Sequence, residues 1–270
     1  MTKKENSKYW ALILGASSGF GESVAIKLAQ DGFNIFGVHL DRQATMPQVN
    51  RIIKDIEKSG SEAVFFNANA ADEQKRKDVV QKIKKKLNNR AGVKVIMHSL
   101  AFGTLKPYIS NESEQITKAQ MEMTLDVMAH SLVYWVQDIF KGNLLADKCR
   151  IFAMTSSGGH SSIPYYGAVS AAKAALESHV RQLTVELGPY NVSVNSIMAG
   201  VTKTPALSKI PGNKSMMEVA ISKNPRDRLT TPEDIANVIS VLCKDGGEWI
   251  SGGIINADGG EDIVSYMGEN

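Results

Sequence analysis

The sequence contains few cysteines, little net charge and no long apolar run. Its 270 residues include two cysteines, Cys149 and Cys243, and no Cys-x-x-Cys pair, which excludes a disulfide scaffold and a cysteine-rich zinc fold. The five histidines include no His-Glu-x-x-His pair, so we expect no metal site. The formal net charge of +3 is too small to indicate a nucleic-acid surface. With 43% hydrophobic and 22% charged residues, the composition is that of a globular chain with a sizeable core.

The start of the chain carries no targeting pattern. Residues 1–6 are charged, and the apolar run 10–14 is too short for a signal peptide. No apolar stretch approaches the roughly 18 residues that a membrane span needs. We therefore expect a protein of the reducing cytoplasm without a membrane span.

Short apolar runs alternate with helical patterns along the whole chain. The predicted strands are 10–14, 34–40, 63–67, 93–98, 150–155, 191–197 and 253–256. The predicted helices are 21–30, 49–59, 72–89, 113–141, 164–187 and 231–243. This alternation predicts one doubly wound α/β domain over residues 1–270, with about seven parallel strands and helices on both faces. Segment 201–228 breaks the rhythm with three prolines and is predicted to be a substrate lid without a clear element.

Three glycines follow the first predicted strand, in the run Gly15-Ala16-Ser17-Ser18-Gly19-Phe20-Gly21. Glycines between a strand and a helix let the backbone approach a phosphate, and the helix N-terminus donates N–H groups to it. The spacing is GxxxGxG rather than the GxGxxG of most Rossmann proteins. The run also fits G-x-S-x-G, which would make Ser17 a hydrolase nucleophile, with His130, His160 or His179 as its base. That alternative does not explain Gly21, so we favour a dinucleotide-binding loop.

Tyr166 and Lys173 lie seven residues apart on one predicted helix. Seven residues is close to two turns, so both side chains share a face. A buried ammonium beside a phenol lowers the phenol pKa from about 10, which makes the tyrosine a proton donor near neutral pH. Taken alone, the pair also fits a core tyrosine and an exposed lysine on an amphipathic helix.

From about residue 9 to residue 262 the chain resembles the short-chain dehydrogenase/reductase superfamily, which implies a Rossmann-type fold. The resemblance rests on the glycine run, on Tyr166 and Lys173, and on residues 194–197 and 254–260. Typical members have Tyr-x3-Lys, but Val169 stands four residues before Lys173 here. The Tyr-x6-Lys spacing is similar to a divergent branch, the enoyl-acyl-carrier-protein reductases. Residues 98–102, 173–177, 187–189 and 199–200 are also similar to that branch.

The longer spacing has a chemical consequence. The two groups lie about 10.5 Å apart along the helix axis rather than about 6 Å. The resemblance implies that Lys173 holds the nicotinamide ribose in either case, so Tyr166 meets a different point above the nicotinamide. This fits an enoyl thioester, in which hydride adds to Cβ and the negative charge develops on the thioester oxygen. The resemblance therefore implies a reductase of an enoyl thioester that uses a nicotinamide dinucleotide.

The candidate site departs from that branch in three ways. Ser156 stands where many members of the branch have a second tyrosine, and it also falls where typical superfamily members place a catalytic serine. Met128 stands where typical members have a helical asparagine, and the usual Asn-Asn-Ala-Gly after the fourth strand is absent. Two alternatives therefore stay open: a carbonyl or alcohol oxidoreductase that uses Ser156 and Tyr166, and a non-catalytic dinucleotide-binding regulator.

The end of the second predicted strand bears on the choice of dinucleotide. His39 occupies the usual acidic position, and Asp41 and Arg42 follow it. An acidic side chain favours NADH through the ribose hydroxyls, whereas an arginine favours NADPH through the 2′-phosphate. We expect NADPH through Arg42 with help from His39, and NADH is the alternative. By resemblance, further cofactor contacts are expected at Asn69, Ala70, Ser99, Gly200, Thr202 and Thr204.

Segment 201–228 carries a formal charge of +4, and Met216 and Met217 give it adaptable apolar surface. Such a segment suits an acyl chain on an acidic carrier protein or on coenzyme A, although a solvated loop has the same composition. The resemblance also implies a homo-oligomer, most simply a tetramer. Segments 113–141 and 164–187 are candidate interface helices, but core packing explains their apolar faces equally well.

Overall fold

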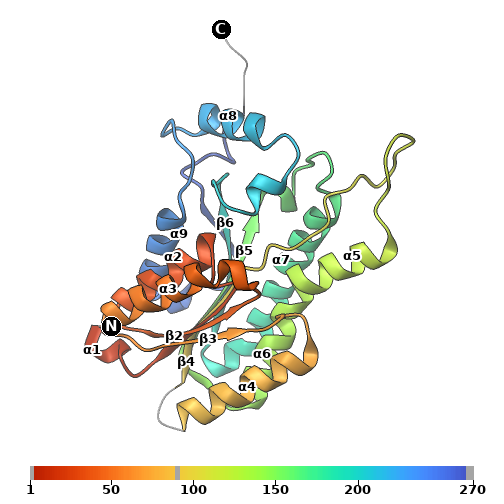
Figure 1. Cartoon of the computed structure of the whole chain (residues 1–270). Helices are drawn as coiled ribbons and strands as arrows, with labels where there is room; N and C mark the ends of the chain where they lie inside the picture. The colour runs from red at the N-terminus through yellow and green to blue at the C-terminus, as the bar shows by residue number, and fades with distance from the viewer. Residues whose placement is uncertain (1–2, 89–91, 266–270) are drawn as a thin grey trace.

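The computed structural model describes residues 3–88 and 92–265, and its centre is a seven-stranded parallel sheet (Figure 1). The strands are β1 (Trp10–Leu14), β2 (Asn34–His39), β3 (Ala63–Asn67), β4 (Val93–His98), β5 (Leu145–Ser156), β6 (Ser193–Ala199) and β7 (Ile254–Ala257). Their order in the sheet is β3-β2-β1-β4-β5-β6-β7. The order reverses between β1 and β4, and ligands of open α/β sheets bind beyond the carboxyl ends of strands at such a point.

Helices cover both faces of the sheet, which confirms the predicted fold class. The main helices are α2 (Gly19–Gln30), α3 (Met46–Lys58), α4 (Glu73–Leu87), α5 (Lys118–Leu125), α6 (Ser131–Lys141), α7 (Gly167–Leu187), α8 (Asn213–Lys223) and α9 (Pro232–Leu242), and a short α1 (Lys3–Asn6) precedes β1. Apolar residues of α2, α3 and α9 pack on one face, and those of α4, α6 and α7 pack on the other. Both faces are buried because parallel strands are joined by helical crossovers.

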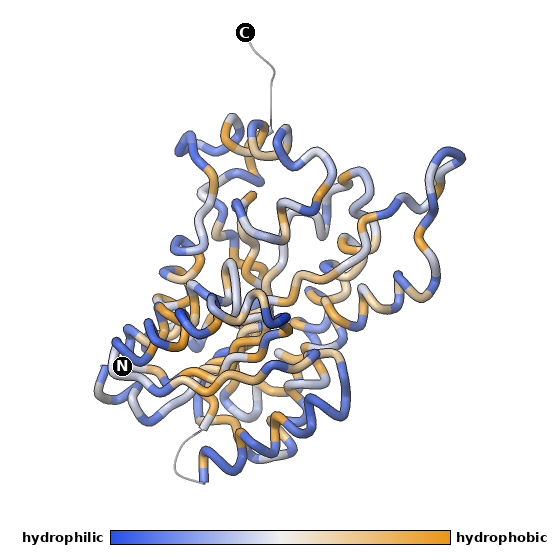
Figure 2. Tube along the Cα trace, viewed as in Figure 1, coloured by the Kyte–Doolittle hydropathy of each residue, from blue (hydrophilic) through white to orange (hydrophobic). Residues whose placement is uncertain are grey.

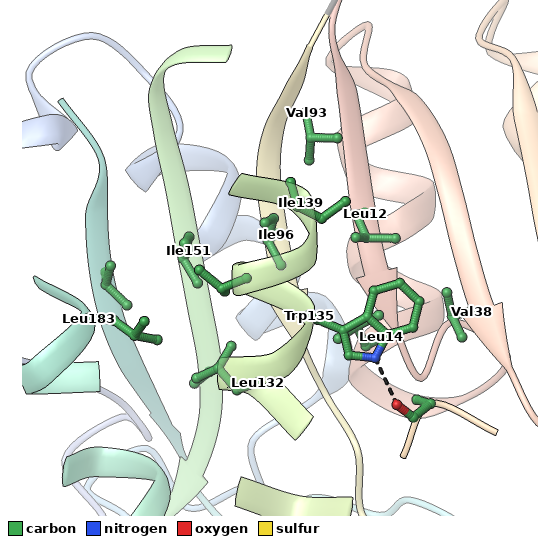
Figure 3. Close-up of a cluster of buried hydrophobic side chains, with 14 of the residues drawn as sticks. Leu12, Leu14, Val38, Val93, Ile96, Leu132, Trp135, Ile139, Ile151 and Leu183 are labelled. Carbon is green, nitrogen blue, oxygen red and sulfur yellow. Dashed lines mark hydrogen bonds between the residues drawn. The ribbon is translucent and has the colours of Figure 1, made fainter. Parts of the chain in front are cut away.

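The central strand β1 is therefore apolar along its whole length, whereas the outer turns of α4 are hydrophilic (Figure 2). Trp135 of α6 is fully buried against Leu12 and Leu14 of β1 (Figure 3). Its indole Nε1 donates a hydrogen bond of 2.8 Å to the carbonyl of Ala70, which follows β3. This bond satisfies the one polar atom of the indole inside an apolar cluster. It also fixes the position of the segment that leaves β3 at the carboxyl edge of the sheet.

Two of the predicted helices begin later than expected. The helix predicted from residue 113 begins at Lys118, because Thr117 and Gln120 form a reciprocal capping box that satisfies the first N–H groups. Its continuation is interrupted by a π-helical turn at Asp126–His130 before α6. The helix predicted from residue 164 begins at Gly167, with Tyr166 as its N-cap residue. Tyr166 thus stands at the helix boundary rather than inside the helix.

Segment 201–228 contains more regular structure than its sequence predicts. Helix α8 lies within it, after Gly212 with a φ of +77°. In Figure 1, α8 lies beyond the carboxyl ends of β5 and β6. Asp72 caps α4, and the end predicted for that helix at Asn89 falls outside the described residues. In the described part of the chain, no helix is long and apolar enough to cross a membrane.

Candidate active site

The glycine loop turns the chain sharply from β1 into α2 at the carboxyl edge of the sheet. The N–H groups of Gly15 and Ala16 donate to the carbonyl of Val38 over 2.9 and 3.0 Å, and Ser99 N–H donates to Leu14 over 2.9 Å. A Cβ on Gly15, which has a φ of +90°, would lie 2.5 Å from the Ser99 carbonyl oxygen. This position therefore needs glycine both for its backbone angle and for its space.

The start of α2 has the geometry of an anion site. Ser18 is the N-cap residue but makes no side-chain capping bond, so the first N–H groups of the helix have no partner from it. A Cβ on Gly21 would lie only 2.0 Å from the Gly15 carbonyl oxygen, which shows how closely helix and loop approach. Gly19 has a φ of +54° and lies beside Thr204. The pyrophosphate of a dinucleotide fits these residues, since helix N-termini bind phosphate.

The histidines proposed as bases for a Ser17 nucleophile are engaged elsewhere. His130 Nδ1 and His179 Nε2 lie 3.0 Å apart between the π-helical turn and α7. His160 pairs with Asp262 at 3.1 Å. Ser17 itself lies beside the Asp41 carboxylate. The structure therefore does not form the serine–histidine pair that a hydrolase would need.

A histidine–aspartate pair lies where the sequence predicts the adenosine end of the cofactor site. His39 Nδ1 lies 3.0 Å from Asp41 Oδ2, and the His39 side chain is 2% exposed. Asp41 N–H donates to Asn67 Oδ1 and its carbonyl accepts from Asn67 Nδ2, at 3.1 and 2.8 Å. Burial acts to raise the pKa of Asp41, but hydrogen bonds from Ser17, Thr45 and His39 hold that pKa below its ordinary value. Arg42 is exposed, and the Asp41 carboxylate lies beside Ser17 of the glycine loop.

Other predicted cofactor residues follow the same edge. Ala70 is buried, and the exposed Asn69 accepts the N–H of Ala71 through Oδ1 at 3.1 Å. Thr202 is buried and donates to the Gly200 carbonyl over 2.9 Å. A Cβ on Gly200 would lie 2.5 Å from Thr230 Oγ1, so the end of β6 is tightly packed. These residues and the glycine loop lie along one edge of the sheet, although they follow three different strands, β1, β3 and β6.

Lys173 is buried on α7 and anchored to the sheet. Its Nζ donates a 2.6 Å hydrogen bond to the Met154 carbonyl of β5. Burial lowers the pKa of Lys173 to about 8, and the nearby Glu177 acts in the opposite direction. One residue along the same strand, Thr155 Oγ1 donates to Glu177 Oε1 over 2.5 Å. The Lys173 and Glu177 side chains, four residues apart, thus hold two consecutive residues of β5 immediately before Ser156.

The side chains of Tyr166 and Ser156 meet at the carboxyl end of β5. A Cβ on Gly158 would lie 2.5 Å from Tyr166 Cε1 and 3.3 Å from Ser156 Oγ, so both side chains converge on that glycine. Ser156 Oγ is buried and has no partner of good hydrogen-bond geometry within residues 3–88 and 92–265. An unsatisfied buried hydroxyl marks a place where a ligand or water oxygen binds. The structure therefore brings the two predicted substrate-contacting side chains together.

The expected decrease in the phenol pKa is wrong for this structure. Burial raises the pKa of Tyr166, and the adjacent Ser156 hydroxyl offsets only part of the rise. Lys173 does not cause a decrease, because its ammonium is directed to Met154. Tyr166 is consequently a neutral phenol at neutral pH, which can donate a hydrogen bond or a proton.

Val169 occupies the position where a typical member would have its tyrosine, and it is buried. A Cβ on Gly103 would lie 2.7 Å from Val169 Cγ2 and 2.9 Å from Met128 Sδ. Met128 is likewise buried, in the π-helical turn. These apolar contacts replace the polar groups that typical members have at the two positions.

A buried histidine lies next to this region. Ser131 Oγ donates to the Val127 carbonyl at 2.8 Å, so His98 Nε2, also at 2.8 Å, donates to Ser131. Burial, reinforced by the charge of Lys173, lowers the pKa of His98 to about 3. The imidazole is therefore neutral, and its Nδ1 is an acceptor without a partner in the described part of the chain.

Both ends of segment 201–228 are attached to the turn after β7. Val201 N–H donates to the Glu261 carboxylate at 3.1 Å, and Asn224 Nδ2 donates to the Asp258 carbonyl at 2.9 Å. Burial raises the pKa of Glu261, although the Val201 N–H acts against that rise. Arg228 forms two hydrogen bonds with Asp234 of α9, at 2.6 and 3.0 Å. Its charge is thus paired outside the segment.

The sequence analysis did not identify three residues that support this site. Glu177 was detectable from its spacing of four residues after Lys173 on a helix. Gln48, which donates to the Ser17 carbonyl at 3.1 Å, and Glu261 reach the site from distant segments. No local pattern in the sequence indicates those two contacts.

Comparison with known proteins now assigns the family. A family profile described as enoyl-(acyl carrier protein) reductase matches residues 15–261. The chain belongs to the short-chain dehydrogenase/reductase superfamily. As a member, it is an oxidoreductase that uses a nicotinamide dinucleotide.

The relatives of this superfamily member have different activities in their names. The chain is 26% identical over 260 residues to the enoyl-[acyl-carrier-protein] reductase [NADH] of Aquifex aeolicus, covering 96% of this chain and 93% of that protein. It is 26% identical over 270 residues to a versicolorin reductase of Emericella nidulans, covering 93% and 94%. The crystal structure of the Aquifex aeolicus enoyl reductase matches the fold with a TM-score of 0.83 at 22% identity, covering 97% of this chain and 99% of that one.

Proposed function

We propose that this chain reduces the carbon–carbon double bond of an enoyl thioester. The observation that carries the proposal is the position of the phenol. Val169, four residues before Lys173, is packed against Gly103 in the core, and Tyr166 at the start of α7 converges with Ser156 instead. The phenol therefore lies farther from Lys173 than in Tyr-x3-Lys members, as suits a substrate whose oxygen is distant from its hydride-accepting carbon. The description of the matching family and the name of the Aquifex aeolicus relative support the same reaction.

The nicotinamide dinucleotide, when bound, supplies the hydride. In the substrate, hydride addition at Cβ shifts the double-bond electrons toward the thioester, and negative charge develops on its oxygen. Tyr166 donates a hydrogen bond or its proton to that oxygen, and protonation at Cα completes the reduction. Ser156 Oγ, which is buried beside the Tyr166 phenol, donates to the same oxygen. Lys173 holds the ribose hydroxyls with its ammonium, fixed in place by the Met154 carbonyl.

The proposal includes NADH as the preferred dinucleotide, in place of the NADPH expected from Arg42. The support is the Asp41 carboxylate, which lies beside Ser17 of the glycine loop and is held by His39. A carboxylate there accepts hydrogen bonds from ribose hydroxyls and repels a 2′-phosphate.

The proposal extends to the substrate lid, the acyl carrier, the assembly and the location of the protein. In it, residues 1–270 form one domain, and segment 201–228 is its substrate lid. Exposed Lys209 and Lys214, beside Met216 and Met217, suit an acyl group on an acidic carrier protein. A homotetramer in the cytoplasm completes the proposal, and the two cysteines, both buried and unpaired, are compatible with a reducing compartment.

One observation favours a second candidate, reduction of a carbonyl group. Ser156 lies beside Tyr166, and a serine–tyrosine pair can hold a ketone oxygen. The deciding experiment compares crotonyl and acetoacetyl thioesters of coenzyme A and of a carrier protein, each with NADH and with NADPH. We expect turnover of the crotonyl thioester with NADH. Turnover of the acetoacetyl thioester alone would establish the second candidate, and tight dinucleotide binding without any turnover would indicate a regulator.

A further inference from the structure

A cavity lies beside the proposed reacting centre, on the outer side of the residues that precede α7. It is open to the surface, with a volume of about 600 Å³. Its apolar lining includes Tyr108, Ile109, Ile163, Pro164 and Tyr165, and its polar lining includes Lys106, Ser110, Glu112 and Ser113. Two lining residues, Tyr165 and Gly167, flank Tyr166 in the chain. Pockets of roughly 300–1,000 Å³ hold small-molecule ligands, whereas a four-carbon acyl group needs far less room.

One wall of this cavity is a strained tyrosine. Tyr166 N–H donates to the Ile163 carbonyl over 3.1 Å, which closes a turn with Pro164 at its second position and Tyr165 at its third. Tyr165 has a φ of +64°, and this combination is a type II turn, whose third residue is normally glycine or asparagine. A bulky residue in the left-handed region is an outlier, and such strain is concentrated at functional sites.

The strain has a clear geometric result. Tyr166 is directed inward to Gly158 and Ser156, while the next ring back, Tyr165, lines the cavity and is 46% exposed. Glycine at position 165 would satisfy the turn without strain, but it would remove this wall. The sequence thus has tyrosine at position 165, although the backbone angle there favours glycine.

The opposite wall is Tyr108, which is held in place. A Cβ on Gly167 would lie 2.6 Å from Tyr108 Cζ, so the ring packs directly on the first residue of α7. The loop that carries Tyr108 extends away from the body of the molecule between β4 and α5 (Figure 1). Its base is closed by the Ile116 N–H to Pro107 carbonyl bond of 3.0 Å and by the Lys106–Glu114 ion pair of 2.6 Å.

We propose that Tyr165 and Tyr108 form a subsite for the distal part of a long acyl chain whose thioester lies at Tyr166, the residue between Tyr165 and Gly167 of the pocket wall. The inference rests on the proposed function, since it names the acyl class that the site takes. Tyr108, Ile109, Ile163, Pro164 and Tyr165 provide apolar surface for the methylene groups of such a chain.

The test measures binding, so it does not depend on turnover. Affinities of dodecanoyl and butyryl coenzyme A are determined by calorimetry in the presence of NAD⁺ for the wild type, Tyr165→Gly, Tyr165→Asn and Tyr108→Ala. In the wild type the dodecanoyl thioester binds more tightly. In each variant we expect the ratio of dodecanoyl to butyryl Kd to rise about tenfold. Tyr165→Gly should also raise the Tm by about 2 °C, because the turn loses its strain.

Asn143→Gly is the matched control, since Asn143 also has a positive φ of 55° but lies in the turn after α6. It should raise the Tm without changing the Kd ratio. Equal affinity of the wild type for both thioesters, or an unchanged ratio in both Tyr165 variants, would overturn the subsite. Crotonyl turnover without a chain-length preference removes the subsite and leaves the proposed function. A changed ratio of the two Kd values without enoyl turnover would support the subsite and contradict the proposed function.

Discussion

The glycine-loop edge and the walls around Tyr166 are built in different ways. At the glycine loop, the decisive contacts are between backbone atoms: a Cβ on Gly15 or Gly21 would lie 2.5 or 2.0 Å from a carbonyl oxygen. Around Tyr166, side chains decide the geometry, and they come from the end of β5, from α7 and from the loop after β4. The glycine loop therefore tolerates few substitutions. The geometry around Tyr166, in contrast, changes when residues in any one of these segments are replaced.

This difference matches the chemistry of the two ligands. A pyrophosphate has the same shape in every dinucleotide, so a rigid backbone site serves it. Substrates of the superfamily differ, as the enoyl and versicolorin reductases among the relatives illustrate by name. A site made from separate loops can change one wall without moving the others. The substitutions below, in order of decreasing effect, test whether the two regions respond as differently as their contacts imply.

The largest effect is expected at the glycine loop. Gly21→Ala forces α2 away from Gly15, and we expect NADH affinity to fall more than 100-fold, as a titration of NADH fluorescence would show. Gly188→Ala is the control, because a Cβ there meets nothing within 4 Å. It should leave the affinity unchanged and raise stability by about 0.4–1 kcal/mol. Normal NADH binding by Gly21→Ala would refute the backbone description of this edge.

Next in size is the loss of the phenol hydroxyl. Tyr166→Phe keeps the ring against Gly158 but removes the proton donor, so turnover should fall by about 10²–10⁴-fold with the NADH Kd unchanged. Steady-state kinetics and a binding titration on the same preparation separate the two effects. Tyr190→Phe, at an exposed position, is the control. Unchanged turnover in Tyr166→Phe would remove the tyrosine from the mechanism.

A smaller effect concerns the choice of dinucleotide. Asp41→Asn keeps the shape of the side chain and removes the charge beside Ser17. We expect the ratio of kcat/KM for NADH to that for NADPH to fall about tenfold, because the 2′-phosphate is no longer repelled. Asp55→Asn, on the exposed face of α3, should leave the ratio unchanged. A wild type that prefers NADPH would contradict the assignment before any variant is made.

The smallest effect is a shift in a pH profile. Lys173 has a pKa lowered to about 8 by burial, and Glu177 opposes that decrease. Charged Lys173 is lost as pH rises through this value, so NADH binding weakens on the alkaline side. Glu177→Gln removes the opposing charge and should move that decline to lower pH, with a loss of a few-fold near pH 8 and little change near pH 6.

The exposed Glu186→Gln on the same helix is the control for this shift. A merely structural role for Glu177 would lower activity equally at both pH values, whereas the charge effect depends on pH. A decline at the same pH in Glu177→Gln and in the wild type would contradict the role assigned to Glu177.

Much of the fold followed from local patterns in the sequence. Alternating apolar runs and helical periodicity predicted the seven parallel strands and the two helical layers, because a strand or helix buried on a known face leaves a period in its own residues. The glycine run also lies, as the sequence indicates, between the first strand and the first helix of the sheet. These features depend on residues that are close in the sequence, or on positions where only glycine, which has no Cβ, fits between backbone atoms.

What the sequence could not determine depends on contacts between distant segments. The start of α7 at Gly167 and the raised pKa of Tyr166 differ from what was predicted, and the pairing of Asp41 with His39 was not predicted at all. Each is decided by burial or by a partner that reaches it through space, as Ser156 reaches Tyr166 and Asn67 reaches Asp41. Protonation and orientation follow the surrounding solvent and charge, and only the tertiary structure brings those together.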